Sequence, residues 1–304
     1  MKILIVCSAN SGKIAPFILE QGESLLRIGL EVDYYTIVGK GLLGYWKNKA
    51  SLLQKIKSFQ PDIIHAHYGL SGLLANTQRK IPVLTTYLGT DINNSRLFLL
   101  SKLNMFFSKY NIFVSEKTQR KSDLTTKVTL LPYGINTVLF TPTDKLLARK
   151  LLGFHSDDLL VVFAGAFKNP IKNPGLAKEA VQLISNVKLL ELGNYTREEL
   201  SQLMNAVDVA LMTSFTEGSP QFIKEAMACN CPIVSVSVGD VPFVVEGVEG
   251  CFIASYEAEN LAEKIKMALS FGKRTEGRKR IIELGWSTEE VAEKLVSLYR
   301  EILY

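Results

Sequence analysis

Cysteine is scarce in this chain of 304 residues, which contains only Cys7, Cys229, Cys231 and Cys251. Their number and spacing fit neither a disulfide framework nor a zinc site, because no second cysteine pair or nearby histidine accompanies Cys229 and Cys231. We therefore expect the cysteines to pack as ordinary apolar side chains.

Long apolar runs are also missing. Apolar runs such as Ile3–Cys7 and Val241–Val245 are far too short to cross a bilayer. Lys2 and the apolar residues after it fit a first β-strand and are too few for a signal peptide. We therefore expect a cytoplasmic protein, peripheral at most to the inner face of the membrane.

The glycine motif of nicotinamide-binding proteins, G-x-G-x-x-G, is absent from the turn after the first strand. That turn reads Ser8-Ala9-Asn10-Ser11-Gly12, and no acidic residue ends the second strand. The sequence therefore argues against a dinucleotide site. A small, polar turn still lets a ligand approach the backbone at Gly12, and an ordinary strand-to-helix turn is the alternative.

The composition that remains is that of a globular protein with uneven charge. Apolar residues make up 47% of the chain and charged residues 21%. Residues 1–145 hold 18 Lys+Arg and 9 Asp+Glu (+9), whereas residues 146–304 hold 17 and 21 (−4), which together give the net charge of +5. The basic first half predicts an anionic partner, such as a membrane surface, a lipid-linked phosphate or nucleic acid.

Short apolar strands alternate with helical segments along the chain. In the first half we expect strands at Lys2–Cys7, Glu31–Val38, Ile63–Ala66, Val83–Tyr87, Ile112–Val114 and Lys127–Leu131, with helices at Ile14–Ile28 and Lys49–Phe59. After a polar segment, 137–156, we expect strands at Leu159–Phe163, Val187–Leu192, Val207–Met212, Pro232–Val236 and Cys251–Ile253. The helices expected there are Gly175–Ile184, Arg197–Ala206, Pro220–Cys229, Ala258–Leu269 and a last one near Glu289–Leu303. This alternation, in a chain too long for one core, predicts an α/β protein of two doubly wound parallel-sheet domains facing a cleft.

Two glutamates eight positions apart, Glu217 and Glu225, bracket the most informative segment. An apolar strand precedes it, and the Gly218-Ser219-Pro220 turn opens a helix. The free amides and the dipole at such a helix start form a site for a phosphate or diphosphate. Carboxylates beside an anion site are explained by a ligand with both phosphates and hydroxyls, such as a nucleotide sugar.

Two lysines, Lys168 and Lys172, follow the first strand of the second half. A lysine at the carboxyl end of a strand supplies a point charge to a phosphate. Solvated surface lysines are the alternative interpretation.

Two histidines, His65 and His67, end a strand of the first half and should point to the same face. A metal site formed by these two histidines would lack a third ligand, and we leave open whether one of the histidines lines a ligand cleft.

The segment Lys40–Phe59 alternates basic residues with Leu, Tyr and Trp. This composition is typical of a segment that lies on an anionic membrane surface, with a core-packed helix as the alternative. No RNA-binding signature supports a nucleic-acid partner.

Taken together, these residues resemble the GT-B-fold retaining glycosyltransferases of the group-4 type. The second half carries the matching segments Glu217–Pro220, Glu225–Ala228, Cys231–Val234 and Gly239–Pro242, which include the E-x7-E motif of the family. The first half matches more loosely at 61–67, 85–91 and 132–136. The resemblance covers nearly the whole chain.

The resemblance implies a donor domain that binds a UDP-, GDP- or ADP-sugar without a cofactor or a metal. Glu225 would accept hydrogen bonds from the ribose, and Glu217 would contact the sugar hydroxyls and act with Lys172 in catalysis. The diphosphate would be held by Gly218, Ser219, Pro220, Gln221 and Lys168, with Gly12 nearby.

The resemblance also implies an acceptor domain at 1–142, a donor domain at 143–288 and a helix at 289–304 that packs back on the first domain. His67, Leu88 and Asp91 would lie on the acceptor side, and the acceptor would be a glycan or a lipid-linked molecule. Leu88 stands where the family often has a histidine, and one βα unit is missing between Ile184 and Gly193. A non-catalytic module that binds sugar nucleotides or glycans is therefore the alternative function.

Overall fold

The computed structural model describes residues 1–193 and 195–304. The chain forms two compact units, the first made of Met1–Gly134 and Thr288–Tyr304, and the second of Ile135–Ser287. Each unit contains one parallel sheet with helices packed on it, so the predicted α/β class with two parallel sheets is confirmed. None of the described helices is long and apolar enough to cross a membrane.

The first unit has a six-stranded sheet of order β2-β1-β3-β4-β5-β6. Its strands are β1 (Lys2–Ser8), β2 (Glu31–Ile37), β3 (Ile63–His67), β4 (Val83–Tyr87), β5 (Tyr110–Phe113) and β6 (Val128–Leu130). Its helices are α1 (Pro16–Arg27), α2 (Gly41–Trp46), α3 (Lys49–Phe59), α4 (Gly69–Ala75), α5 (Thr90–Asn93), α6 (Ser95–Phe107), α7 (Glu116–Ser122) and α15 (Thr288–Leu303).

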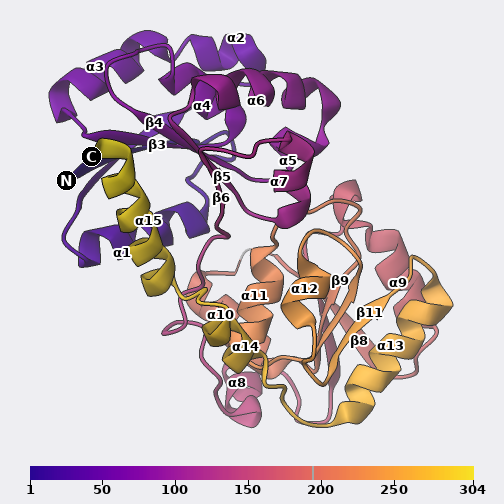
Figure 1. Cartoon of the computed structure of the whole chain (residues 1–304). Coiled ribbons are helices and arrows are strands. Elements are labelled where there is room, and N and C mark those ends of the chain that lie inside the picture. The colour runs from indigo at the N-terminus through magenta and orange to yellow at the C-terminus, as the bar shows by residue number, and fades with distance from the viewer. Residues whose placement is uncertain (194) are drawn as a thin grey trace. The chain divides into compact units, whose positions relative to one another are not determined.

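Alternation along the buried strands produces two apolar layers in this unit. On β1, Ile3 and Ile5 pack with residues of α1 and α15, whereas Leu4 and Val6 pack with residues of α2, α3 and α4. Successive side chains of a strand point to opposite faces, so both faces of a doubly covered sheet are apolar. Figure 1 shows α1 and α15 below this sheet and α2, α3, α4 and α6 above it.

The last helix, α15, belongs to the first unit although it ends the chain. Leu295 and Tyr299 are fully buried among apolar residues of α1 and the sheet. The Tyr299 hydroxyl also lies 2.7 Å from Nδ1 of His65, in the middle of β3. These contacts tie the C-terminal helix to the sheet formed by the start of the chain.

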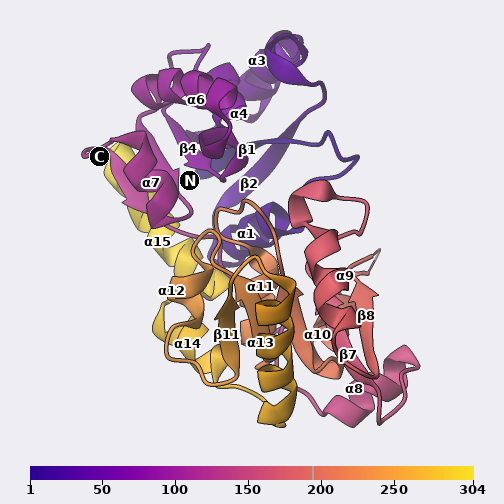
Figure 2. The same ribbon diagram turned by 90° about the vertical axis from the view of Figure 1, so that its right-hand side faces the viewer.

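The second unit has a five-stranded sheet of order β11-β10-β9-β7-β8. Its strands are β7 (Leu159–Phe163), β8 (Val187–Glu191), β9 (Val209–Met212), β10 (Ile233–Val236) and β11 (Cys251–Ala254). Its helices are α8 (Lys145–Leu152), the 3-10 helix η1 (Pro170–Lys172), α9 (Pro174–Gln182), α10 (Arg197–Ala206), α11 (Gln221–Ala228), α12 (Val241–Val245), α13 (Ala258–Phe271) and α14 (Gly277–Glu283). Figure 2 shows α9 and α13 in front of this sheet, on the side opposite to α10 and α11.

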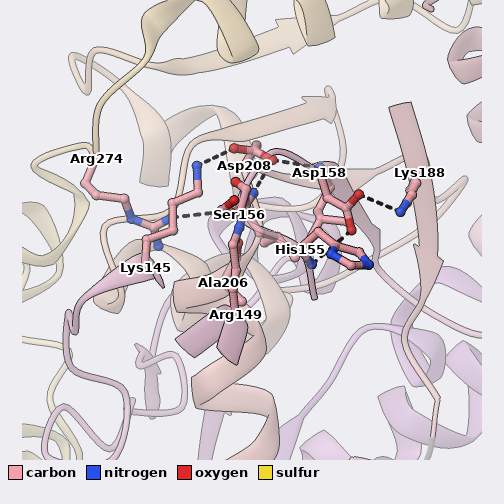
Figure 3. Close-up of polar contacts among 11 residues, drawn as sticks. Lys145, Arg149, His155, Ser156, Asp158, Lys188, Ala206, Asp208 and Arg274 are labelled. Atoms are coloured by element: carbon pink, nitrogen blue, oxygen red, sulfur yellow. Dashed lines mark hydrogen bonds and ion pairs between the residues drawn. The ribbon is translucent and has the colours of Figure 1, made fainter. Parts of the chain in front are cut away.

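The polar segment expected at the domain boundary contains a helix, α8, which is a correction to the sequence prediction. Asp144 caps this helix, since its side chain accepts a hydrogen bond of 2.7 Å from the Leu147 amide. The helix is anchored by a buried Arg149, whose guanidinium lies 2.8 Å from Asp208 and 2.9 Å from the Ala206 carbonyl (Figure 3). Apolar residues recur along α8 with helical spacing, but Leu146, Leu147 and Leu151 are exposed and Arg149 is the residue that is buried.

The four cysteines are free, and Cys7, Cys229 and Cys231 are buried in the apolar cores. Burial raises the pKa of the Cys7 and Cys229 thiols to about 12. The cysteines therefore pack as apolar side chains, as the sequence predicted.

Candidate functional site

The topology of the second sheet places two of the predicted segments next to each other. The chain leaves β7 to form β8 on one side and then returns to form β9 on the other side of β7. In parallel α/β sheets, ligands bind beyond the carboxyl ends of the strands where the order reverses in this way. The segments that leave β7 and β9 are 164–173 and 213–220, the lysine turn and the carboxylate turn.

The lysine turn is shaped so that Lys172 points toward the carboxylate turn. The Thr213 hydroxyl, just after β9, lies 2.9 Å from the Lys172 carbonyl and fixes the end of η1. A Cβ atom at Gly165 would lie 2.8 Å from Cγ of Lys172, so glycine is needed where this side chain passes. The Lys172 ammonium then lies 2.6 Å from Oε1 of Glu217.

The start of α11 leaves backbone amides open, as the sequence predicted. The helix begins at Gln221 after Pro220, and no side chain caps it. Gly239 packs against the preceding turn, with φ of +58° and a position at which a Cβ atom would lie 2.6 Å from the Gly218 carbonyl. The side-chain nitrogen of Gln221 is buried, and no partner for it exists among the described residues. Open amides at a helix start together with a buried amide donor suit a phosphate ligand.

The second glutamate of the pair, Glu225, is held by a residue that the sequence did not single out. Its side chain is 4% exposed, and its Oε1 lies 2.5 Å from a guanidinium nitrogen of Arg197. Arg197 begins α10 and lies over the Phe140 ring, 4.7 Å from the ring centre. Arg197 follows the capping residue Thr196, and its position at the carboxyl end of β8 is the signal that sequence reasoning missed.

A fully buried cation, Lys224, belongs to α11 itself. Burial lowers the pKa of Lys224 to about 8, while the nearby carboxylates of Asp240 and Glu225 act in the opposite direction. Its ammonium lies 5.3 Å from the centre of the Trp286 ring. Burial also raises the pKa of Asp240. Lys224 and Asp240 are thus two buried charged groups of opposite sign in this region.

Two predicted site residues lie on the surface. Lys168 is exposed, and the described residues offer it neither an ion pair nor a hydrogen bond. Gly12 is exposed in the turn after β1, has φ of +90° and donates a hydrogen bond of 2.9 Å to the Ala9 carbonyl. The turn requires a positive φ at this position, and this requirement explains why the residue is a glycine.

The first sheet has its own reversal point, between β1 and β3, and a pocket of about 480 Å³ opens there. It is lined by Ser8, Asn10, Ala15, Phe17, Ile18, Lys40, Gly41, Tyr45, His67, Tyr68, Leu70, Leu88, Thr90 and Leu97. His67 and Leu88 of the predicted acceptor residues therefore share this pocket, whereas Gly12 and Asp91 are not among its lining residues.

The two histidines of β3 stack on each other, with ring centres 4.3 Å apart. Burial lowers the pKa of His65 to about 3 and also holds the pKa of His67 well below its usual value. Nδ1 of His67 lies 2.5 Å from the Tyr133 hydroxyl, and its Nε2 is buried with no partner among the described residues. His67 is thus a neutral imidazole with one ring nitrogen available. The described residues contain no cluster of three or more potential metal ligands.

Asp91 lies in the interior of the first unit. Its carboxylate accepts hydrogen bonds of 3.0, 2.9 and 3.0 Å from the amides of Leu88, Gly89 and Gly69. Burial raises its pKa, while these amide bonds act in the opposite direction. Asp91 therefore fixes the conformation of the turns after β3 and β4, and the turn after β4 places Leu88 in the lining of the pocket.

Two family models match the chain. Residues 5–139 match the model described as Glycosyltransferase Family 4, and residues 146–270 match Glycosyl transferases group 1. The chain belongs to the group 1 glycosyltransferases. The two matches divide the chain much as its two units do, so each half of this glycosyltransferase chain carries its own family signature.

Curated relatives include the D-inositol 3-phosphate glycosyltransferases of mycobacteria. The protein from Mycobacteroides abscessus is 26% identical over 57% of this chain and 46% of its own length. The Mycolicibacterium smegmatis protein is 20% identical over 86% of this chain and 80% of its own length. The first relatives compared are matched over 46% to 60% of their lengths, so the chain spans about half of them.

Solved structures share the fold. Sucrose-phosphate synthase from Thermosynechococcus elongatus has a TM-score of 0.85 at 19% identity, with 99% of each chain covered. The Anabaena protein HepE in complex with UDP has a TM-score of 0.77 at 18% identity, with 99% of this chain and 100% of that chain covered. HepE has also been solved with UDP-glucose. These likenesses establish the GT-B fold for the group 1 chain described here.

Proposed function

We propose that the protein transfers a sugar from a nucleoside diphosphate sugar to a glycan or lipid-linked acceptor, with retention of anomeric configuration. The observation that carries this proposal is the pair of acid–base contacts beside the open start of α11, Lys172 with Glu217 and Arg197 with Glu225. Cations near open amides suit a diphosphate, and carboxylates beside them suit hydroxyl groups. A nucleotide sugar carries both.

The donor side of the reaction is assigned to the second unit. The amides at Gly218–Gln221 would hold the diphosphate, and Glu225 would accept hydrogen bonds from the ribose. Glu217 would accept hydrogen bonds from the sugar hydroxyls after the bound donor has replaced part of the contact between Glu217 and Lys172. HepE, which shares the fold, was solved with UDP and UDP-glucose, and this supports a nucleotide sugar as donor.

In the proposed reaction, the bond between the anomeric carbon and the leaving phosphate breaks as the acceptor hydroxyl attacks the same face. The proton of that hydroxyl passes to the departing phosphate oxygen, which keeps the configuration without a protein nucleophile. Negative charge develops on the leaving diphosphate, where Lys172 and the amides stabilise it. We propose that these groups serve without a metal, and an unchanged rate in the presence of a chelator is the expected result.

The acceptor is assigned to the pocket of the first unit. Most of its lining is apolar or neutral, and Nε2 of His67 is the buried polar atom without a partner. A neutral imidazole nitrogen can accept a hydrogen bond from an acceptor hydroxyl or donate one to its oxygen. We further propose that the acceptor is met at an anionic membrane surface, by a protein peripheral to the inner face, with the segment Lys40–Phe59 as part of the contact.

Incubation with a panel of UDP-, GDP- and ADP-sugars tests the donor proposal. We expect one donor to release its nucleoside diphosphate, and Glu217→Ala to lose this activity. The matched control is Glu249→Ala, which removes a carboxylate that is 83% exposed in the same unit. The proposal that the protein is an enzyme would be refuted if neither nucleotide release nor glycan extension occurred and Glu217→Ala bound the donor as well as wild type.

Leu88 favours one alternative, a module that binds sugar nucleotides or glycans without catalysis. It presents an apolar side chain to the pocket of the first unit, at the position where the family often has a histidine. This alternative predicts saturable binding of a nucleotide sugar without turnover. Leu88→His would then leave the protein inactive, whereas an active enzyme should change its preference among donor sugars.

A further inference from the structure

An apolar groove of about 480 Å³ lies on the surface of the first unit, between α2, α4 and α6. We call it the α2–α6 groove. It is lined by Leu42, Leu43, Trp46, Leu73, Asn76, Thr77, Arg79, Leu100, Leu103 and Phe107. Figure 1 shows the three helices side by side on the outer face of this unit, and Figure 2 shows α4 and α6 there from a second direction.

Large apolar side chains protrude from the helices of this groove. Leu43 on α2 is 81% exposed, and Leu99 and Phe106 on α6 are 71% and 82% exposed. Single exposed apolar residues are common on proteins, but a contiguous set around an apolar groove marks an interaction site. Leu43 lines the groove, and Leu99 and Phe106 adjoin its lining residues in the chain, so this surface favours a partner that offers apolar area.

The stretch of chain that forms the groove is basic, although two of its lysines, Lys55 and Lys102, pair with Asp33 and Asp123. Residues 34–115 contain ten basic residues, Lys40, Lys47, Lys49, Lys55, Lys57, Arg79, Lys80, Arg96, Lys102 and Lys109. The same stretch has two acidic residues, Asp62 and Asp91, of which Asp91 is fully buried. Helices α2, α3, α4 and α6 carry none. The partner must therefore be anionic as well as apolar.

Aromatic and cationic groups alternate at the edge of the groove. The Lys49 ammonium lies 4.8 Å from the centre of the Trp46 ring, and the Arg79 guanidinium lies 4.1 Å from the centre of the Phe107 ring. Tryptophan and long basic side chains are favoured at the boundary between lipid headgroups and acyl chains, because each has an apolar body and a polar end.

We propose that the α2–α6 groove is the surface by which this protein docks on a bilayer that contains anionic phospholipids. Leu43, Trp46, Leu99 and Phe106 enter the headgroup boundary, and the lysines around them contact lipid phosphates. A second copy of the chain fits less well, since a symmetric contact would place two basic faces together. A nucleic acid would contact the cations but leave the apolar centre without a partner.

This inference rests on the membrane part of the proposed function and assigns the membrane contact to a different set of residues. The sequence placed it on Lys40–Phe59, but α3 (Lys49–Phe59) has only Leu52 buried and lies beside the groove without lining it. The apolar part of the surface comes from α2 and from α6, which lies about fifty residues further along the chain. Membrane docking does not depend on sugar transfer, so either proposal can fail alone.

Co-sedimentation of the full chain with vesicles tests the surface. We expect binding to vesicles of phosphatidylcholine mixed with phosphatidylglycerol, weaker binding at high salt, and little binding to phosphatidylcholine alone. Leu43→Glu should weaken binding at least about tenfold, since it replaces an apolar side chain that would enter the bilayer with a charge that anionic lipids repel. Lys40→Ala and Lys47→Ala should each weaken it about fivefold.

The matched control is Leu151→Glu, the same change at a leucine that is 61% exposed on α8 of the second unit. Both leucines are exposed, so neither variant should disturb folding, and a melting curve checks this. Equal binding of Leu43→Glu and wild type, or equal binding to both kinds of vesicle, would overturn the proposal. If wild type dimerises in gel filtration and Leu43→Glu does not, the groove is a self-association surface and the membrane proposal is overturned. Nucleotide release, measured without vesicles, reports on the donor site separately.

Discussion

Ribose recognition by Glu225 gives the sharpest prediction. Its carboxylate is 4% exposed, and one oxygen lies 2.5 Å from Arg197. A carboxylate fixed through one oxygen presents the other in a defined direction, and we propose that this second oxygen accepts the ribose hydroxyls. Glu225→Gln keeps the size of the side chain and removes the charge. Arg197→Gln keeps the carboxylate and removes the group that fixes it.

The expected magnitudes follow from the contacts. A hydrogen bond to a charged group contributes about 1.5–3 kcal/mol, so Glu225→Gln should weaken nucleotide binding roughly 10- to 100-fold. Arg197 is 24% exposed, so its contact with Glu225 is partly screened. Arg197→Gln should therefore cost about 1 kcal/mol, or about fivefold in Kd.

Calorimetric titration with UDP, 2′-deoxy-UDP and 3′-deoxy-UDP measures these effects. Wild type should prefer UDP to at least one deoxy analogue, Glu225→Gln should show little preference, and Arg197→Gln should be intermediate. The double variant should resemble Glu225→Gln, because both changes act on one contact. Glu249→Gln, at an exposed carboxylate, serves as the control.

An unchanged preference for ribose in Glu225→Gln would refute the role of this carboxylate. Additive losses in the double variant would refute the idea that Arg197 acts through Glu225. A protein that binds none of the three ligands, nor GDP or ADP, would instead count against the proposed donor site.

Three further predictions concern the frame of the second unit. The pKa of Lys224 is lowered from 10.5 to about 8, so the unfolded chain binds more protons between these values and wild-type stability should rise with pH there. Lys224→Met should remove this rise, about 3 kcal/mol across the window, in urea unfolding at pH 7 to 10.5. Arg149→Ala leaves Asp208 without its buried partner and should lower the unfolding free energy by roughly 3–5 kcal/mol, whereas the exposed Lys150→Ala should change it little. Gly239→Ala places a methyl group against the Gly218 carbonyl in a left-handed conformation, which should cost about 1–2 kcal/mol in stability and weaken nucleotide binding. Unchanged melting of Gly239→Ala would contradict the close packing.

Strands and strongly periodic helices were predictable from local sequence. The bounds of β4, α3, β7 and α10 agree with the sequence prediction, because buried parallel strands are short, apolar and set off by polar turns. The helices that were missed have a different composition. Helix α6 has apolar residues on all its sides, so it lacks the alternation that marks an amphipathic helix. Helix α8 has this alternation, but it is only eight residues long and lies within a polar segment.

The donor segment could also be predicted, but its partners could not. Glu217, Glu225 and the turn between them lie within one stretch of chain, where spacing defines a strand, a turn and a helix start. Arg197 and Lys172 come from other βα units, and their contacts with the glutamates depend on the strand order β9-β7-β8. Local sequence carries no information about that order.

The sequence by itself determined the α/β class, the two parallel sheets and the family, since each rests on local periodicity or on motifs within one segment. Only the tertiary structure decided which charges meet, that Asp91 is buried under two turns, and that apolar residues of α2 and α6 line one groove. Those outcomes depend on contacts between residues distant in the chain, which strand order and packing establish.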